Sequence, residues 1–202
     1  MAKTANTDSR DKCRFVTDEF RVSYPHVFKA QGLAGSKPKF SVTMLFSKKA
    51  DLSKIKLAIK HAKIAQWVAD PKNWAEKIES PVVDGDAPKY ADKEGYKGHW
   101  AIKASTSEDA RPGVVDRDLE PITDPSVFYP GCFARAQVFA RVWEFPKDSG
   151  RFGIHFILDH VQKTKEGKSF SNRKDAAEVF DPIAGSDDEE VEETADEDGG
   201  FM

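Results

Sequence analysis

The sequence has little cysteine and no long hydrophobic segment, and both absences exclude classes of protein. Its 202 residues include only Cys13 and Cys132, far apart and without a CxxC pair, so neither a disulfide framework nor a zinc site is indicated. No apolar run approaches the roughly 20 residues that a membrane helix needs. The polar N-terminus lacks the apolar centre of a secretory signal. We therefore expect a protein of the reducing cytoplasm with no membrane partner.

Catalytic signatures are missing as well. The chain has no phosphate-binding glycine loop, no HExxH and no GxSxG. His155 and His160 lie on one predicted strand at a spacing that should turn them to opposite sides. Asp84 and Asp86 could hold a divalent metal, but no third ligand has a suitable spacing, so turn chemistry explains them better. We expect no enzyme activity, no metal site and no cofactor.

No lysine or arginine follows Lys174, so the chain consists of a basic part and an acidic part. Residues 1–174 hold all 31 Lys and Arg against 22 Asp and Glu, a formal charge of +9, whereas the rest has twelve acidic residues and no basic one. Acidic segments with few apolar residues stay disordered and often act as interaction tails. We expect a flexible N-terminus over 1–12, one folded domain over 13–180 and a disordered acidic tail over 181–202. A tail that only aids solubility is the simpler alternative.

Alternating apolar and polar residues predict a β-rich domain with one long helix. Residues Phe20 to Tyr24 predict a first strand that ends at Pro25. Asp51 is a suitable N-cap for a helix over 51–69, whose apolar residues recur at helical spacing. Further strands are expected over 39–47, 99–106, 113–117 and 151–162.

The most informative predicted strand runs from Gly131 to Phe145, because its two faces differ chemically. One face is small and apolar and consists of Cys132, Ala134, Ala136, Val138, Ala140 and Val142. The other consists of Phe133, Arg135, Gln137, Phe139, Arg141, Trp143 and Phe145. Aromatic rings stack on unpaired bases and guanidinium groups pair with phosphates, so the second face suits nucleic acid. The alternative is that this face forms the core and its arginines reach past it.

The candidate contacts are aromatic or basic residues on predicted strands or at their ends. The central ones are Phe133, Arg135, Phe139, Arg141 and Trp143, and the flanking ones are Tyr24, Lys39, Trp100, Lys103, Tyr129 and Arg151. Together with the basic charge they indicate a groove that binds single-stranded nucleic acid with little sequence preference. Binding of double-stranded DNA stays open, because phosphate attraction does not distinguish strands.

Six short sequence segments occur in a characteristic order along the domain. They are RVSYPHVF (21–28), KPKFSVTMLF (37–46), PVVDGD (81–86), YKGHW (96–100), FYPGCFARA (128–136) and GIHFILDHVQ (153–162). Together they resemble a phage-encoded family of single-stranded-DNA-binding proteins, first catalogued as a domain of unknown function. The resemblance covers about residues 13–180. It implies an OB-like barrel with loop insertions, and a role in phage DNA replication, recombination or repair in the bacterial cytoplasm.

The resemblance also implies a role for the acidic tail. It is similar to the tails of bacterial and phage single-strand binders, so Asp196, Glu197, Asp198 and Phe201 are the candidate partner-binding residues. Such a polyanion is expected to compete with DNA for the basic groove and to recruit replication or recombination proteins. The rival interpretation is a protein-binding module or inhibitor whose acidic tail mimics DNA. Self-association is left open.

Overall fold

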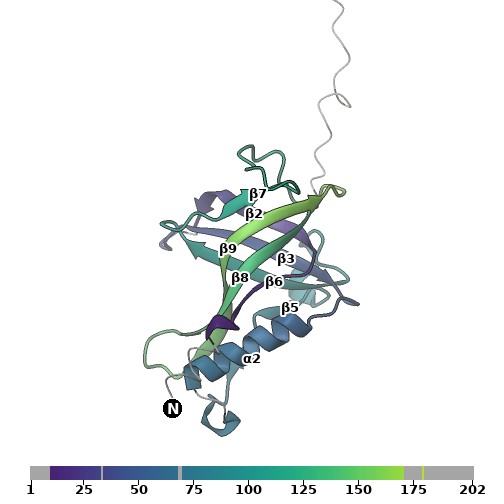
Figure 1. Ribbon diagram of the computed structural model, residues 1–202. Helices are drawn as coiled ribbons and strands as arrows, with labels where there is room; N and C mark the ends of the chain where they lie inside the picture. The colour runs from purple at the N-terminus through teal and green to yellow at the C-terminus, as the bar shows by residue number, and fades with distance from the viewer. Residues whose placement is uncertain (1–9, 33, 68–69, 171–178, 180–202) are drawn as a thin grey trace, which may run out of the picture. The chain divides into compact units, whose positions relative to one another are not determined.

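The computed structural model describes residues 10–32, 34–67, 70–170 and 179. The chain divides into a compact unit over 1–171 and a second unit over 172–202. The tail residues Asp196, Glu197, Asp198 and Phe201, and most of the N-terminal segment over 1–12, lie outside the described residues. Every element labelled in Figure 1 belongs to the first unit.

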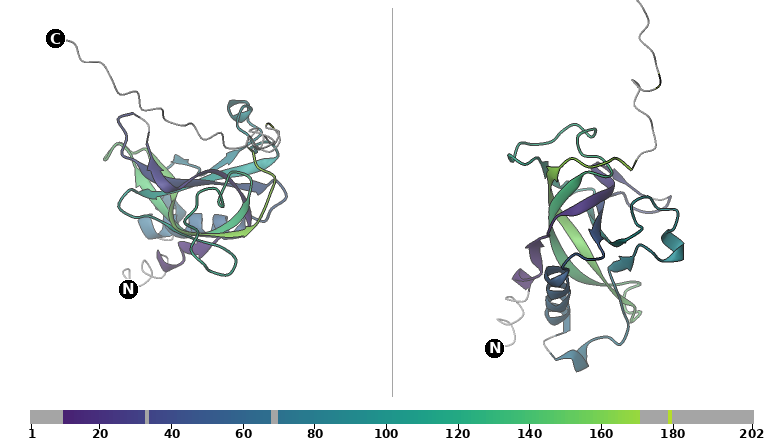
Figure 2. Two further views of the ribbon diagram at one scale, coloured as in Figure 1. Left: turned by 90° about the horizontal axis from the view of Figure 1, so that it is seen from above. Right: turned by 90° about the vertical axis from the view of Figure 1, so that its right-hand side faces the viewer.

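The long strands close into a barrel. They are hydrogen-bonded in the order β8 (Phe133–Glu144), β2 (Phe20–Gln31), β3 (Lys39–Ser47), β6 (His99–Ser107) and β9 (Phe152–Lys165), and β9 pairs back with β8. Neighbours in this ring are antiparallel except β6 and β9. The left panel of Figure 2 shows the ring from above. This closed, β-rich arrangement with one long helix is an OB-type barrel, as the sequence predicts.

Short strands pair with individual strands of the ring. They are β1 (Arg14–Val16) on β8, β4 (Ile78–Glu79) on β9, β5 (Val82–Asp84) on β6 and β7 (Gly113–Val115) on β9. Between its long helix and β6, the chain also makes two short 3-10 turns at Pro71–Asn73 and Pro88–Tyr90. The insertion between β3 and β6 therefore adds both a helix and a looped segment to the barrel.

The small face of β8 lies inside the barrel. Its residues are all buried, and all belong to the main core cluster: Cys132, Ala134, Ala136, Val138, Ala140 and Val142. Successive strand residues alternate sides, so the face with aromatic residues and arginines is the outer face of the barrel. The alternative that this face forms the core is therefore wrong.

Helix α2 (Ser53–Trp67) crosses one end of the barrel (Figure 1). Its buried residues Ile55, Ala58 and Ala62 belong to the same core cluster as the strands. The Ser53 backbone N–H donates to the Asp51 carboxylate at 2.8 Å, which lowers the pKa of Asp51 and caps the helix. The predicted helix is confirmed up to Trp67. No helix in the described part of the chain is long and apolar enough to cross a membrane.

Two irregularities correct expectations based on strict alternation. Strand β2 does not end at Pro25 but continues to Gln31, with a register shift between Ser23 and His26 and a φ of 46° at Tyr24. Proline is tolerated at such a bulge because no ladder N–H is needed there. A second shift, in the β8–β9 pair, puts both His155 and His160 on the outside, whereas the sequence spacing predicts opposite sides.

Candidate nucleic-acid interface

A pocket of about 360 Å³ opens on the outer face of β2, β3 and β6, and we call it the tyrosine pocket. The segment between β5 and β6 supplies part of its wall. The lining residues are Tyr24, His26, Ser41, Thr43, Pro81, Val83, Tyr90, Lys93, Tyr96, Ala101 and Lys103. The lining thus combines aromatic, basic and small side chains, and no carboxylate is among them.

Three tyrosines gather around one ammonium group in this pocket. The ring centroids of Tyr24 and Tyr90 lie 6.4 Å and 5.5 Å from that of Tyr96. Lys93 Nζ lies 5.5 to 5.6 Å from all three centroids. Tyr24 is 44% exposed, whereas Tyr96 is 5% exposed, and its burial raises the pKa of its hydroxyl. Tyr96 thus supports the pocket from below, and Tyr24 offers a ring at the surface.

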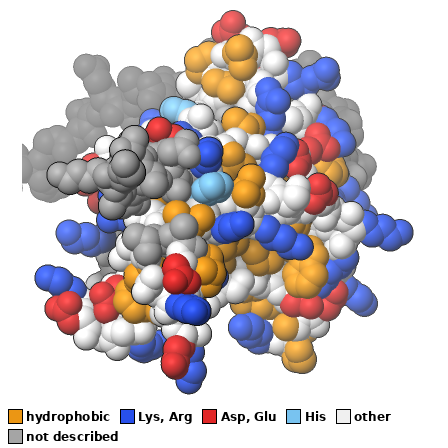
Figure 3. All heavy atoms as spheres, turned by 60° about the horizontal axis from the view of Figure 1, so that its bottom comes forward, with side chains coloured by type: hydrophobic (Ala, Val, Ile, Leu, Met, Phe, Trp, Pro, Cys, Tyr) orange, Lys and Arg blue, Asp and Glu red, His pale blue; other side chains and the backbone are white. Residues whose placement is uncertain are grey.

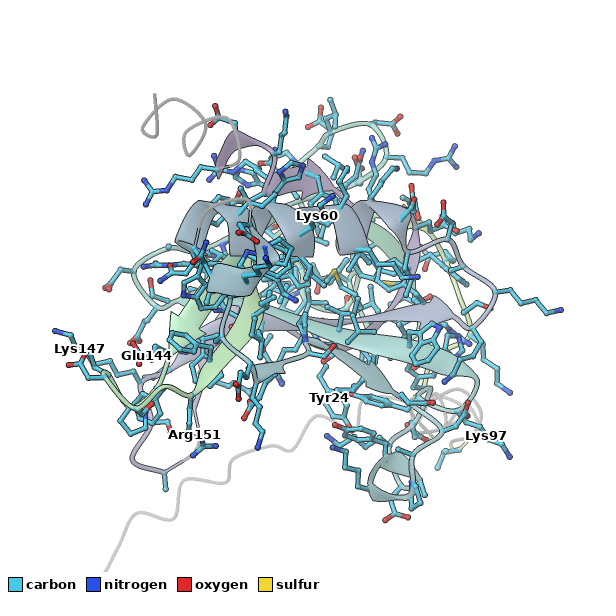
Figure 4. All side chains as sticks on the ribbon, turned by 90° about the horizontal axis from the view of Figure 1, so that it is seen from below. Tyr24, Lys60, Lys97, Glu144, Lys147 and Arg151 are labelled. Carbon is cyan, nitrogen blue, oxygen red and sulfur yellow. The ribbon has the colours of Figure 1, made fainter. Side chains whose placement is uncertain are left out.

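The bulge in β2 explains why Tyr24 is available. A positive φ is sterically unfavourable for a residue with a side chain, so a neighbouring structure must hold it in place. Phe20 and Val22 face the core, so in a regular strand Tyr24 and His26 would face it too. The shift between Ser23 and His26 turns both toward the pocket instead. Figure 4 labels Tyr24 on the same side of the barrel as Lys97 in the 80–98 segment.

Lys48 holds the 80–98 segment onto the barrel. Its ammonium group pairs with Asp84 and, at 3.3 Å, with Asp86, and it lies 3.7 Å from the centroid of the Trp100 ring. Asp86 also accepts the Gly98 N–H at 2.7 Å. Hydrogen bonds from Lys48 and from the backbone lower the pKa of Asp84, and bonds from Gly98 and Lys48 lower that of Asp86. Both carboxylates serve the turn, and the described residues contain no cluster of metal ligands.

A row of outward-facing side chains continues from the tyrosine pocket around the barrel, and we call it the outer band. In β3 and β6, Thr43 lies opposite Lys103 and Ser41 opposite Ser105. Further round, Ser105 pairs with Ile157 of β9, Ile157 with Phe139 of β8, and His155 with Arg141. The band thus consists of Ser41, Thr43, Lys103, Ser105, His155, Ile157, Phe139 and Arg141. It joins the pocket to the aromatic face of β8.

Two histidines along this path, His26 and His155, lie close to positively charged side chains. Partial burial, and then the charge of Lys103, lower the pKa of His26. Burial, followed by the charges of Arg141 and Lys39, lowers the pKa of His155. In both histidines, burial and the nearby positive charges disfavour the protonated imidazole. An anionic ligand in the band would reverse the effect of those cations.

The structure brings several of the predicted contacts to this path. Tyr24 and Lys103 line the tyrosine pocket, Phe139 and Arg141 belong to the outer band, and Lys39 is close enough to His155 to lower its pKa. Trp143 lies further along β8, opposite Gly153. Arg151 is exposed at the end of the β8–β9 connection, 3.6 Å from Glu79, and does not line the tyrosine pocket.

The remaining predicted contacts are placed elsewhere. Trp100 packs against the core cluster, on the opposite face of β6 from Lys103. The Tyr129 hydroxyl lies 2.7 Å from a Glu166 carboxylate oxygen, next to buried Lys163. Arg135 donates to the Gln162 side chain at 2.7 Å.

Phe133 lies at the start of β8, beyond the tyrosine pocket. Its ring centroid is 4.4 Å from Lys165 Nζ and 5.8 Å from Arg21 Cζ. The same Arg21 guanidinium lies 4.3 Å from the ring centroid of Phe170, which packs against the cluster that contains Tyr96. Phe133 is thus linked to the pocket through Arg21 and Phe170 rather than being part of its lining.

The sequence pattern does not reveal the residues that build the tyrosine pocket. Tyr90, Lys93 and Tyr96 lie in a segment rich in Pro, Gly and Asp, a composition typical of a connection, and His26 and His155 stand apart in the sequence. One signal is present, because tyrosines alternate with lysines from Lys89 to Lys97. Figure 3 shows a face of the molecule on which basic and hydrophobic side chains lie side by side, as such contacts require.

Comparisons with known proteins identify the family of the chain. The family model described as "Enterobacter phage Enc34, ssDNA-binding protein" matches residues 13–194. The solved structure of the Enc34 single-stranded DNA-binding protein in complex with ssDNA is 27% identical, with a TM-score of 0.63 over 78% of this chain and 89% of that one. A second structure of the Enc34 protein is 26% identical, with a TM-score of 0.59, and covers 83% and 90%.

A more distant structure shows the fold alone. It is gp2.5, a single-stranded DNA-binding protein encoded by bacteriophage T7, with 12% identity, a TM-score of 0.54 and coverage of 86% of this chain and 98% of that one. No curated protein sequence matches. The family model spans most of the chain, so the chain belongs to the phage ssDNA-binding protein family represented by that of Enterobacter phage Enc34.

Proposed function

We propose that the protein binds single-stranded DNA in phage DNA replication, recombination or repair, with the strand lying in the tyrosine pocket and along the outer band. Bases stack on Tyr24 and on Trp143, while Lys39, Lys93, Lys103 and Arg141 pair with phosphates. Stacking and phosphate pairing depend little on base identity, so sequence preference is weak. The bound state of the Enc34 relative supports this assignment.

The observation that carries the proposal is the arrangement of three tyrosine rings around Lys93 on the outer face of the barrel strands. A purely structural cluster would bury all of its rings, but Tyr24 is 44% exposed and held there by an unfavourable backbone conformation. Strained residues of this kind concentrate at binding sites, where the surrounding structure maintains them for function.

The acidic tail competes with DNA for the same surface and recruits replication or recombination proteins through Asp196, Glu197, Asp198 and Phe201. The described part of the chain supports the competition, because Phe170 packs against the cluster that contains Tyr96 and shares a small cavity with Tyr24. Phe170, the last residue before the undescribed segment 171–178, therefore lies beside the tyrosine pocket. A tethered polyanion has a high effective concentration at a site so close to its attachment.

The test is a titration of the full-length protein and of a form that ends at Gly185. Each is added to a fluorescent oligo-dT and to its duplex at several salt concentrations. We expect preference for the single strand, a steep salt dependence and tighter binding by the shorter form. Absence of binding by either form at low salt would refute the proposal and favour the rival protein-binding module. Equal affinities of the two forms would refute the competition by the tail.

A further inference from the structure

A second cavity, of about 560 Å³, lies where β8 meets helix α2 and the segment that precedes β1. We call it the arginine pocket. Arg10, Arg14 and Arg141 line it together with Asp11, so guanidinium groups outnumber carboxylates. Its other lining residues are Cys13, Ala62, Ala65, Gln66, Phe139, Ala140 and Val142. The volume falls within the range of about 300–1,000 Å³ that is usual for small-molecule sites.

The walls of this pocket have a definite arrangement. Strand β1 pairs with Gln137 to Phe139, and the Ala140 N–H donates to the Cys13 carbonyl at 2.9 Å, which fixes the preceding segment against β8. Arg14 donates to Asp159 at 2.9 Å, and its Cζ lies 5.5 Å from the centroid of the Phe139 ring. Phe139 is thus held beside a cation, with its ring at the surface of the cavity.

The arginine pocket is continuous with the outer band. Phe139 and Arg141 belong to both, since they face Ile157 and His155 of β9 and also line the cavity. A strand that follows the band from Lys103 past His155 therefore reaches the cavity at Arg141. The arginine pocket and the tyrosine pocket share no lining residue, so the outer band is what connects them.

We propose that the arginine pocket is a second DNA subsite, which binds one nucleotide of the strand that leaves the outer band. Its phosphate pairs with Arg10, Arg14 and Arg141, and its base stacks against Phe139. This inference rests on the proposed function, because it extends the path of the same strand. It makes affinity depend on length: only an oligonucleotide that spans the band and enters the cavity gains these contacts.

The test uses oligo-dT of increasing length, from about 4 to about 16 nucleotides, the range of site sizes known for single OB barrels. The variant Arg10→Gln/Arg14→Gln is compared with Lys60→Gln/Arg117→Gln, which removes the same charge from exposed positions on α2 and on the loop after β7. We expect the first variant to bind short oligonucleotides like the control and long ones several-fold more weakly. Its salt slope for long oligonucleotides should fall by about 0.7, because the one nucleotide in the cavity contributes one phosphate contact and each lost single-strand contact removes that amount.

Three outcomes would overturn the subsite. One is an equal loss at every length, which indicates general attraction, and another is no loss at any length. The third is that the full-length variant binds DNA more tightly than the full-length unsubstituted protein, and that this gain is absent when both proteins end at Gly185. That result would mean that the acidic tail occupies the cavity. Absence of binding by the unsubstituted protein at every length would instead refute the proposed function itself.

A second variant covers the case in which the double substitution disturbs the N-terminal segment. Gln66→Glu places a negative charge at an exposed position of α2 that lines the cavity, without touching Arg10 or Arg14. With melting temperature unchanged, it should reproduce the selective loss for long oligonucleotides. Lys60→Gln on the same helix lowers the net charge by the same one unit and is its control, and an identical effect of both substitutions would contradict the subsite.

Discussion

The indole ring of Trp143 lies over Gly153, its direct partner in the β8–β9 pair. A Cβ atom at Gly153 would come within 2.6 Å of three atoms of that ring. The glycine therefore lets the indole lie against the strand on the outer face of the barrel. Support of one face is what the proposed stacking of a base on the other face of Trp143 requires.

We expect Trp143→Ala to weaken single-stranded DNA binding by about 1–3 kcal/mol, the usual contribution of one stacked base, with little change in melting temperature. Fluorescence titration and thermal unfolding measure the two effects. Leu57→Ala, at a 54% exposed position on α2, is the control for loss of a surface hydrophobic residue. A fall in stability of several kcal/mol would show that the indole is a core residue and contradict the platform.

Gly153→Ala should impair both properties at once. The added methyl group displaces the indole from its support, so the variant is expected to be less stable and to bind DNA more weakly than the unsubstituted protein. In the background of Trp143→Ala the same glycine substitution should have little further effect on binding. Additive losses of binding free energy in the double variant would argue that Gly153 acts independently of the indole.

Tyr24 allows stacking and backbone strain to be separated. Tyr24→Ala and Tyr24→Gly both remove the ring, so both should weaken DNA binding to a similar extent. They should differ in stability, because φ at this position is 46° and glycine adopts such a conformation without the steric cost of roughly 1 kcal/mol that alanine incurs. Chemical denaturation of the two variants measures the difference. An alanine variant as stable as the glycine variant would contradict the strained conformation.

The barrel is predictable because its strands carry local patterns. The small residues of β8 alternate with large ones along its whole length, and Asp51 with the apolar spacing behind it identifies α2. Strict alternation fails at Tyr24 and between His155 and His160, where register shifts add a residue that no local pattern reveals. The outward placement of Trp143 is one of two interpretations that the sequence allows, and only closure of the barrel decides between them.

The tyrosine pocket cannot be derived from the sequence for a different reason. Tyr24 and Tyr96 lie far apart in the chain, and their rings meet because the inserted segment is fixed to β6 by the β5–β6 pairing, by backbone hydrogen bonds and by Lys48. Trp100 and Lys103 are both predicted as contacts, yet their positions on β6 put them on opposite faces. Sequence composition identifies the kinds of residue in the interface better than it identifies their positions.

Lys48 should control DNA binding from outside the pocket. Lys48→Met removes the ammonium group from Asp84, Asp86 and the Trp100 ring, so the turn that carries Tyr90 and Tyr96 keeps its backbone hydrogen bonds but loses its side-chain attachment to Lys48. We expect faster hydrogen exchange over residues 84–98 and weaker DNA binding. Because Lys48 rather than a metal satisfies the carboxylates, a chelator should leave the affinity of the unsubstituted protein unchanged. Unaltered exchange in the variant would contradict the role of Lys48.

The same site predicts a dependence on pH through His26 and His155. The pKa of each is lowered in the free protein, so the unfolded chain binds protons more readily and stability should decline as pH falls below about 6.5. Phosphates in the tyrosine pocket and the outer band favour the protonated forms of His26 and His155, and they oppose the effect of Lys103, Arg141 and Lys39. The protein should therefore take up protons when it binds DNA. Its affinity for DNA should rise as the pH falls from about 7.5 to about 5.5.

The variant His26→Gln/His155→Gln separates these histidines from other titrating groups. It should flatten both the loss of stability and the gain in affinity over that range, whereas His160→Gln, on the outside of β9 but beyond the band, should retain both. Titrations at constant ionic strength are required, because salt alone changes phosphate binding. If affinity rises equally in the double variant and in the unsubstituted protein, the protons are taken up elsewhere, and the strand does not lie beside these two imidazoles.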